Sequence, residues 1–332
     1  MTESSSRAAM AAGEPAILVR IIGWAMLGAL VAFLVNNVLS VGFGFSGPLA
    51  IFKDGANFGQ GAVQVGLFAV ALLLAILLVL GTRETTLRLD AARVHRFNVY
   101  LIRALFWAVL FVGVTDVFIA FMRVESGFDS FLSETMVQHF SSPRWVGHYI
   151  HIPLIVIAFI VAGFTRTLGF HWLAILIVMA ELTIVISRFV FSYEQALMAD
   201  LVRYWYAALF LFASAYTLFD DGHVRVDVLY AGFGNTTRGK VNAFGAILLG
   251  MTTAWVILYI GFNGKQSIIN SPVLNFEVTQ SGNSGMFVKY QMAAFLGIFA
   301  ATMLIEFVSF FFEAVANWRD EPGARAFEPV AH

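Results

Sequence analysis

Ionisable residues inside apolar segments are the first candidates for chemistry in this chain. Asp116, Glu181 and Glu306 each lie in a long apolar run, where a charge is costly in lipid and marks either a functional site or a packing contact. Arg123 follows Asp116 by two helical turns, and Arg188 follows Glu181 by seven residues. An ion or proton site would need several acidic or hydroxyl groups to converge. We therefore expect these carboxylates to form interhelical contacts or to meet a partner subunit.

Histidines form a second group of candidates. His148 and His151 are three residues apart and share one helical face, and His139 lies nearby in a loop. With Asp129 and Glu134 they could complete a metal site, or the histidines could hold a haem, but the spacing matches no specific metal motif. We expect histidines at the membrane interface that hydrogen-bond water. The sequence predicts no catalytic, cofactor-binding or metal-binding residue.

A charged stretch at residues 220–227 separates two apolar regions. His223 and Asp227 are four residues apart, so on a helix they share a face and could hydrogen-bond each other. Asp221 precedes them, and Arg225 lies between them, where it could meet a lipid phosphate. The alternating apolar residues could dip into the acyl region. We predict a membrane-surface elbow whose side chains position helices rather than touch a solute.

Composition shows what kind of molecule must position these residues. Of the 332 residues, 59% are hydrophobic and only 12% are charged, whereas a soluble domain has about 25% charged residues. This predicts an all-α polytopic membrane protein. The net charge of −1 leaves no basic surface for nucleic acid, and the absence of cysteine excludes thiol chemistry. There is no phosphate-binding loop or nucleophile elbow, so we do not expect an enzyme.

Eight segments are long and apolar enough to cross a bilayer, which takes about 20 residues. The first is expected to be retained rather than cleaved, because its apolar run is longer than a signal-peptide core. The predicted spans are Ile17–Val41, Ala62–Gly81, Asn98–Met122, Trp145–Thr165, His171–Arg188, Leu201–Phe219, Val241–Phe262 and Tyr290–Ala314.

The distribution of basic residues predicts the orientation. With the amino terminus inside, thirteen Lys and Arg residues lie inside and seven outside. The even number of spans agrees with this assignment. We therefore expect both termini to be cytoplasmic.

A possible internal repeat links the two halves of the chain. Leu87–Asp90 and Val224–Asp227 are similar short basic stretches, read here as loops, and lie 137 positions apart. The same offset carries the second, third and fourth spans onto the sixth, seventh and eighth. Two copies separated by four helices would share one orientation, which predicts a parallel 4+4 repeat. Chance similarity between apolar helices is the alternative.

Many solute-carrying subunits contain transmembrane helices that are interrupted near the middle of the membrane. The interruption exposes backbone dipoles to the solute. Six of the seven prolines lie outside the predicted spans, and only Pro153 lies within one. At that position we expect a kink. The sequence therefore argues against a solute path made by this chain alone.

The second half carries an ordered set of motifs. An apolar helix ends in the residues 187–191, Ser-Arg-Phe-Val-Phe, and an acidic turn containing Glu194 follows. The next helix carries Trp205 and leads into a His-x-x-x-Asp pattern, His223 to Asp227. In this order the motifs resemble DctQ, the small membrane subunit of tripartite ATP-independent periplasmic (TRAP) transporters.

The resemblance begins at about residue 171 and covers roughly half of the chain. Phe189 stands where the family more often has Tyr, and Gln195 stands at a position that is often acidic. The expected division is a polar tail (1–16), an N-terminal four-helix region (17–166), a DctQ-like four-helix domain (167–318) and a cytoplasmic tail (319–332). The candidate structural or interaction residues are Arg188, Glu194, Trp205, Asp221, His223, Arg225, Asp227, Glu181 and Glu306.

The resemblance implies a function that depends on partners. The chain would brace a large transport subunit (DctM-like) in the bacterial inner membrane and help dock a periplasmic solute-binding protein (DctP-like), for ion-gradient-driven uptake of an organic acid or related solute. Its other contacts would be membrane lipids, and no cofactor is implied. Two alternatives stay open: a membrane anchor or redox subunit that uses the histidines, and a stand-alone channel or carrier.

Overall fold

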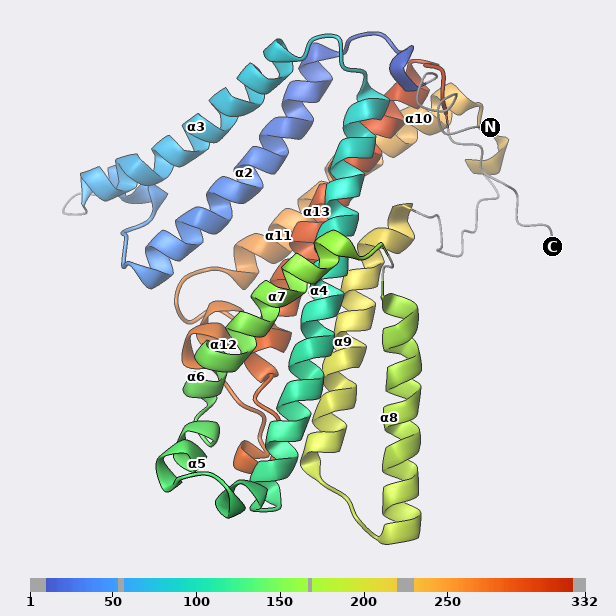
Figure 1. Cartoon of the computed structure of the whole chain (residues 1–332). Helices are drawn as coiled ribbons and strands as arrows, with labels where there is room; N and C mark the ends of the chain where they lie inside the picture. Colours follow the sequence, from blue (N-terminus) through green and yellow to red (C-terminus); the bar gives the residue numbers. More distant parts are fainter. Residues whose placement is uncertain (1–9, 53–56, 167–168, 220–229, 325–332) are drawn as a thin grey trace. The chain divides into compact units, whose positions relative to one another are not determined.

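A computed structural model describes residues 10–52, 57–166, 169–219 and 230–324. All regular secondary structure in these ranges is helical, and eight helical segments are long and apolar enough to cross a membrane (Figure 1). This confirms the predicted all-α class and the predicted number of spans. Six spans are single helices: α2 (Ile17–Gly42), α3 (Phe58–Gly81), α4 (Leu87–Val124), α8 (Phe170–Phe191), α9 (Ala196–Phe219) and α13 (Lys289–Trp318).

The other two spans each contain a π-helical turn. The fourth consists of α6 (Pro143–Val146), η3 (Gly147–His151) and α7 (Ile152–Phe164), and the seventh of α10 (Asn235–Gly245), η5 (Ala246–Met251) and α11 (Thr252–Gly261). The shorter elements are η1 (Pro48–Phe52), η2 (Gly127–Ser130), α5 (Glu134–Phe140), η4 (Tyr230–Gly232), α12 (Asn270–Asn275) and η6 (Gly282–Ser284).

Pro153 explains the first of these turns. A proline in a helix has no N–H to offer the preceding turn, and its ring crowds the carbonyl four residues earlier. The π-helical turn η3 ends two residues before Pro153, at His151. The expected local distortion is therefore a wider helical turn, which is one of the usual causes of a bent helix.

The helix α4 begins at Leu87, well before the predicted start of the third span at Asn98. The reading of Leu87–Asp90 as a loop is therefore wrong, because these residues form the first turn of α4. Thr86 caps this helix, since its hydroxyl accepts the Leu89 N–H at 3.4 Å. The polar side chains of this turn are buried against other helices. Their contacts stabilise a part of α4 that hydropathy does not predict to be helical.

The chain folds into two compact units. Four helices contribute residues to both units: α4, α9, α11 and α13. Unit 1 comprises Met1–Phe97, Leu218–Val256 and Met303–His332, and unit 2 comprises Asn98–Thr217 and Ile257–Thr302.

A buried ion pair organises the first helices of unit 1. The guanidinium of Arg20 on α2 lies 2.7 Å from the Asp90 carboxylate on α4, and both side chains are fully buried. Arg20 also donates to the backbone oxygen and hydroxyl of Thr82, directly after α3. Trp24 donates to the same carboxylate at 2.9 Å. Because a buried charge is tolerated only when it is paired and hydrogen-bonded, these contacts fix the ends of α2, α3 and α4 together.

Unit 2 is built on the remaining part of α4, which packs against α9. The indole of Trp205 on α9 donates to the Val109 carbonyl of α4 at 3.2 Å. The ring covers Gly113, where an added Cβ would collide with the indole, so only glycine permits this approach. Figure 1 shows α8 beside α9 in the same unit.

The predicted repeat is compatible with some helix positions and remains a prediction. Moving α3 by 137 residues gives 195–218, close to α9, and Val124 at the end of α4 moves onto Gly261 at the end of α11. The counterpart of Leu87–Asp90, at 224–227, lies outside the described residues.

Candidate functional site

The predicted site residues that the structure describes belong to two different units. Asp221, His223, Arg225 and Asp227 lie outside the described residues. The other predicted residues are divided between the units: Glu306 belongs to unit 1, whereas Glu181, Arg188, Glu194 and Trp205 belong to unit 2. Each is therefore described in its own surroundings.

The turn between α8 and α9 carries the exposed ion pair of Arg188 and Glu194, whose charged atoms are 3.4 Å apart. Both side chains are more than half exposed, so the pair contributes little to stability. Beside it, the Tyr193 hydroxyl donates to Glu125 at 2.7 Å. Partial burial, together with this bond and the negative charge of Glu125, raises the pKa of Tyr193 to about 12.

Trp205 has a packing role. Its side chain is buried, and its N–H is satisfied by α4 as described above. An indole in this position supplies apolar area and one hydrogen bond to the helix contact.

A buried polar chain in unit 2 surrounds His151. This side chain is fully buried, so the expectation of a water-exposed histidine at the membrane interface is wrong for His151. Its Nδ1 lies 2.9 Å from the Tyr290 hydroxyl and its Nε2 lies 3.2 Å from Asp116. The other Asp116 oxygen accepts the Phe287 backbone N–H at 2.6 Å. Asp116 thus forms the interhelical contact expected of it.

The chain of hydrogen bonds continues to α9. The Gln291 amide donates to the Tyr290 hydroxyl at 3.0 Å, and its oxygen accepts a bond from the Tyr204 hydroxyl. Side chains from α4, η3, α13 and α9 are therefore linked in one network. Each member has a partner, which is the condition under which a buried polar network rigidifies a core.

The three histidines of the predicted metal set are used in different ways. His148 is exposed, and its Nδ1 lies 2.8 Å from the Arg144 carbonyl of its own helix. His139 stacks on Trp145. Both ring nitrogens of His151 are engaged by protein groups. Within the part of the chain that the structure describes, no group of three or more His, Cys, Asp or Glu residues could hold a metal ion.

The segment before α13 is clamped by charged side chains of unit 2. The Arg123 guanidinium donates to the carbonyls of Asn283 and Gly285 at 2.7 and 2.5 Å, and it lies over the Phe287 ring. Asp200 on α9 accepts bonds from the Met286 N–H and the Thr279 hydroxyl, each at 3.1 Å. Neither clamp could be predicted from spacing, because the partners lie about 80 and 160 residues away along the chain.

Glu306 positions the end of α9 in unit 1. Its carboxylate lies 2.9 Å from the Nδ1 of His95 on α4, and the His95 ring stacks on Phe219 with centroids 3.2 Å apart. Phe219 is the last residue of α9 and directly precedes the charged stretch at 220–227. Glu306 thus contacts His95, a partner that sequence reasoning missed, and its structural role stays a prediction.

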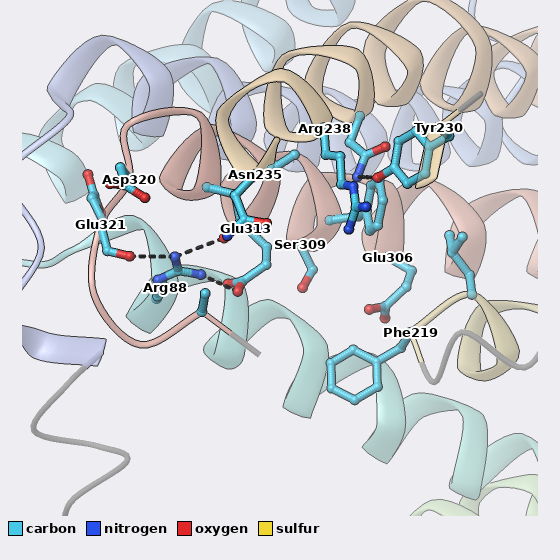
Figure 2. A pocket seen from close by; sticks show the side chains of 16 residues that line it. Arg88, Phe219, Tyr230, Asn235, Arg238, Glu306, Ser309, Glu313, Asp320 and Glu321 are labelled. Carbon is cyan, nitrogen blue, oxygen red and sulfur yellow. Dashed lines mark hydrogen bonds and ion pairs between the residues drawn. The ribbon is translucent and has the colours of Figure 1, made fainter. Parts of the chain in front are cut away.

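A pocket of about 120 Å³ lies in unit 1, lined by residues of α4, α9, α10 and α13 (Figure 2). Arg88 lies at one end and Tyr230 with Arg238 at the other. Arg88 pairs with Glu313 and donates to the Asn317 amide and to the backbone oxygens of residues 321 and 322. This buried arginine therefore fixes the end of α13 and the start of the tail to α4.

The other end of the pocket is polar as well. The Arg238 guanidinium lies 5.4 Å from the centre of the Tyr230 ring, and Asn242 donates to the Tyr230 hydroxyl at 2.8 Å. Phe219 and Tyr230, the described residues on either side of 220–229, both line the pocket. The pocket therefore lies next to the two described residues that flank 220–229, the range that contains the charged stretch.

Glu181 stands apart from these contacts. It is exposed on α8, in the middle of the helix, and forms no hydrogen bond or ion pair with another described residue.

Comparison with known proteins identifies the second half of the chain. No curated protein and no solved structure matches the sequence. Residues 174–317 match the family model described as tripartite ATP-independent periplasmic transporters, DctQ component. The matched range runs from α8 to α13 and contains Glu181, Trp205 and Glu306, in agreement with the resemblance predicted from about residue 171 onward. This multi-pass membrane protein therefore contains, over residues 174–317, a region that matches the DctQ component of the tripartite ATP-independent periplasmic transporters.

Proposed function

We propose that this protein is the scaffold subunit of a TRAP-type secondary transporter in the bacterial inner membrane, where it braces a large DctM-like subunit that carries the solute. The observation that carries the proposal is the DctQ match across four of the eight spans. The transported solute would be an organic acid or a related compound, captured outside the membrane by a separate binding protein.

The use of the buried carboxylates supports a bracing role rather than transport by this chain. Asp116 and Glu306 are each held by a histidine of the same unit, and Asp200 accepts two hydrogen bonds from the segment before α13. A coupling-ion site needs oxygen ligands that turn toward a shared cavity. These carboxylates instead connect helices, as expected in a rigid scaffold.

The clamped segment before α13 is our candidate for the surface that helps dock the solute-binding protein. Under the orientation predicted from the basic residues, this segment faces the periplasm. Arg123 and Asp200 hold its backbone, so little ordering would be needed when a partner binds. Docking surfaces built on fixed backbone bind with less loss of conformational entropy than mobile ones.

Reconstitution tests the proposed function. The chain would be co-expressed with a DctM-like large subunit, and the purified complex would be placed in liposomes with a solute-binding protein and an imposed sodium gradient. Uptake of labelled solute should require all three components and should be absent with this chain alone. Uptake by this chain alone would instead establish a stand-alone carrier. A Soret absorbance band in the purified chain would establish a redox subunit.

A further inference from the structure

The helix α8 is the least covered of the eight spans. Only 11% of its most apolar window is buried inside the protein, compared with 61% for α13. Leu173 and Ile177 are its only buried residues. Such a helix faces either lipid or another protein, and its residue types decide between them.

Glu181 decides the question for one face of α8. It lies at the middle of this 22-residue helix, so it is roughly 15 Å from either end at a rise of about 1.5 Å per residue. At this depth a bilayer offers no water to a carboxylate. The side chain is exposed, and no other described residue bonds to it. A lipid-facing helix would carry an apolar residue here.

The surroundings of Glu181 are apolar. Val178 and Val185, about one turn before and one turn after it, are exposed by 65% and 49%. Arg188 is two turns away and is paired with Glu194 at the end of the helix, so it does not reach the carboxylate. On this face, two exposed apolar side chains therefore flank a single anion.

We propose that this face of α8 docks onto a membrane helix of the large subunit, and that the partner helix presents a basic side chain to Glu181. This inference rests on the proposed function, which supplies the large subunit as the partner. Charge complementarity favours this occupant over a second copy of the chain, because a two-fold contact through the same face would bring two Glu181 carboxylates together. A basic partner within the membrane satisfies the carboxylate, since such groups in spans pair with one another.

Substitutions of Glu181 test the charge pairing. The complex would be purified through a tag on this chain, and the amount of co-purified large subunit would be measured. Glu181→Leu should reduce it by about fivefold or more, and Glu181→Lys should reduce it further, because the pair becomes repulsive. Glu181→Gln should also reduce it, since the charge is lost. If Glu181→Gln bound as well as the wild type, the basic partner would be excluded.

Thr183→Val is the matched control. Thr183 is exposed on the same helix, but its hydroxyl bonds the Met179 carbonyl of its own helix at 2.8 Å. It faces away from Glu181, because residues two apart point to different sides of a helix. The amount of large subunit should not change in this variant. A loss equal to that of Glu181→Leu would show that α8 tolerates no substitution and would overturn the specific role of Glu181.

Photocrosslinking tests the surface without altering Glu181. The chain contains no cysteine, so a single cysteine at Val178 can be labelled uniquely with a benzophenone maleimide. A cysteine at Leu74, which is 60% exposed on α3, is the control for lipid-facing positions. The label at 178 should crosslink to the large subunit in membranes, and the label at 74 should do so several-fold less. Crosslinking of two copies of this chain through 178 would assign the face to a homodimer and would overturn the proposal.

The two proposals fail in different ways. If the wild type co-purifies with the large subunit and supports uptake, but position 178 crosslinks only to lipid, the docking surface is wrong and the proposed function stands. If the wild type captures no large subunit, both are wrong.

Discussion

At the scale of single residues, the histidines show how strongly burial changes the role of a side chain. His148 and His151 are three residues apart, yet one is exposed and the other is fully buried between Asp116 and Tyr290. Spacing alone suggested one shared face. The π-helical turn between Gly147 and His151 widens the helix at this point, and burial is set by the contacting helices.

Replacing the two histidines in turn should therefore give unequal results. His151→Ala leaves the buried Asp116 and Tyr290 without one partner each, which costs about 1–3 kcal/mol for an unsatisfied buried group. His148→Ala removes an exposed ring whose hydrogen-bond partner is the Arg144 carbonyl of its own helix. We expect a clear decrease in the thermal unfolding midpoint of the detergent-solubilised protein for His151→Ala and almost none for His148→Ala. Equal midpoints for the two variants would show that the network contributes no stability.

At the scale of helices, the spans could be predicted well and their extensions could not. Bilayer thickness requires an apolar run of about 20 residues, and such a run can be recognised in a single sequence. The early start of α4 depends instead on buried partners of Arg88 and Asp90, which lie on α13 and α2. Similarly, Glu306 and Asp116 could be identified as candidates, but their partners His95 and His151 are set by tertiary packing. The segment with the family signature, 220–227, lies outside the described residues, so its predicted elbow stays a prediction.

Two glycines of α10 provide a test of helix packing. At Gly239 an added Cβ would meet the backbone of α13, colliding with the Trp318 N–H and lying 2.8 Å from the Ala314 carbonyl oxygen. At Gly245 an added Cβ would meet nothing within 4 Å. Gly239→Ala should therefore destabilise the protein by about 1–3 kcal/mol, because backbone cannot move aside cheaply.

Gly245→Ala is the control on the same helix. It should be neutral or should stabilise by about 0.5–1 kcal/mol, because alanine loses less conformational freedom than glycine in a helix. Both variants would be compared by thermal unfolding in one detergent. A stable Gly239→Ala protein would mean that α10 and α13 do not pack as closely as described.

At the scale of the whole molecule, the boundaries of the two compact units do not coincide with the predicted division at residue 166. Each unit contains residues from both predicted four-helix regions. In unit 1, Arg88 pairs with Glu313, and in unit 2 Asp116 accepts the Phe287 N–H. A duplicated ancestry would therefore not imply that the two regions fold independently today.

Expression of the halves as separate chains tests this dependence. Residues 167–332 alone should not yield a monodisperse helical protein, because the buried carboxylate of Glu306 and the amide of Gln291 lie in networks that include His95, Asp116 and His151 of the other half. Co-expression of residues 1–166 with residues 167–332 should restore a complex that co-purifies and unfolds cooperatively, since the cut falls between α7 and α8 and breaks no helix. A cut within α4, between Arg103 and Ala104, is the control and should not be rescued, because it interrupts a continuous helix. If residues 167–332 alone matched the intact protein in helical content and unfolding midpoint, the DctQ region would be an independent domain and the interlocked arrangement of the halves would be wrong.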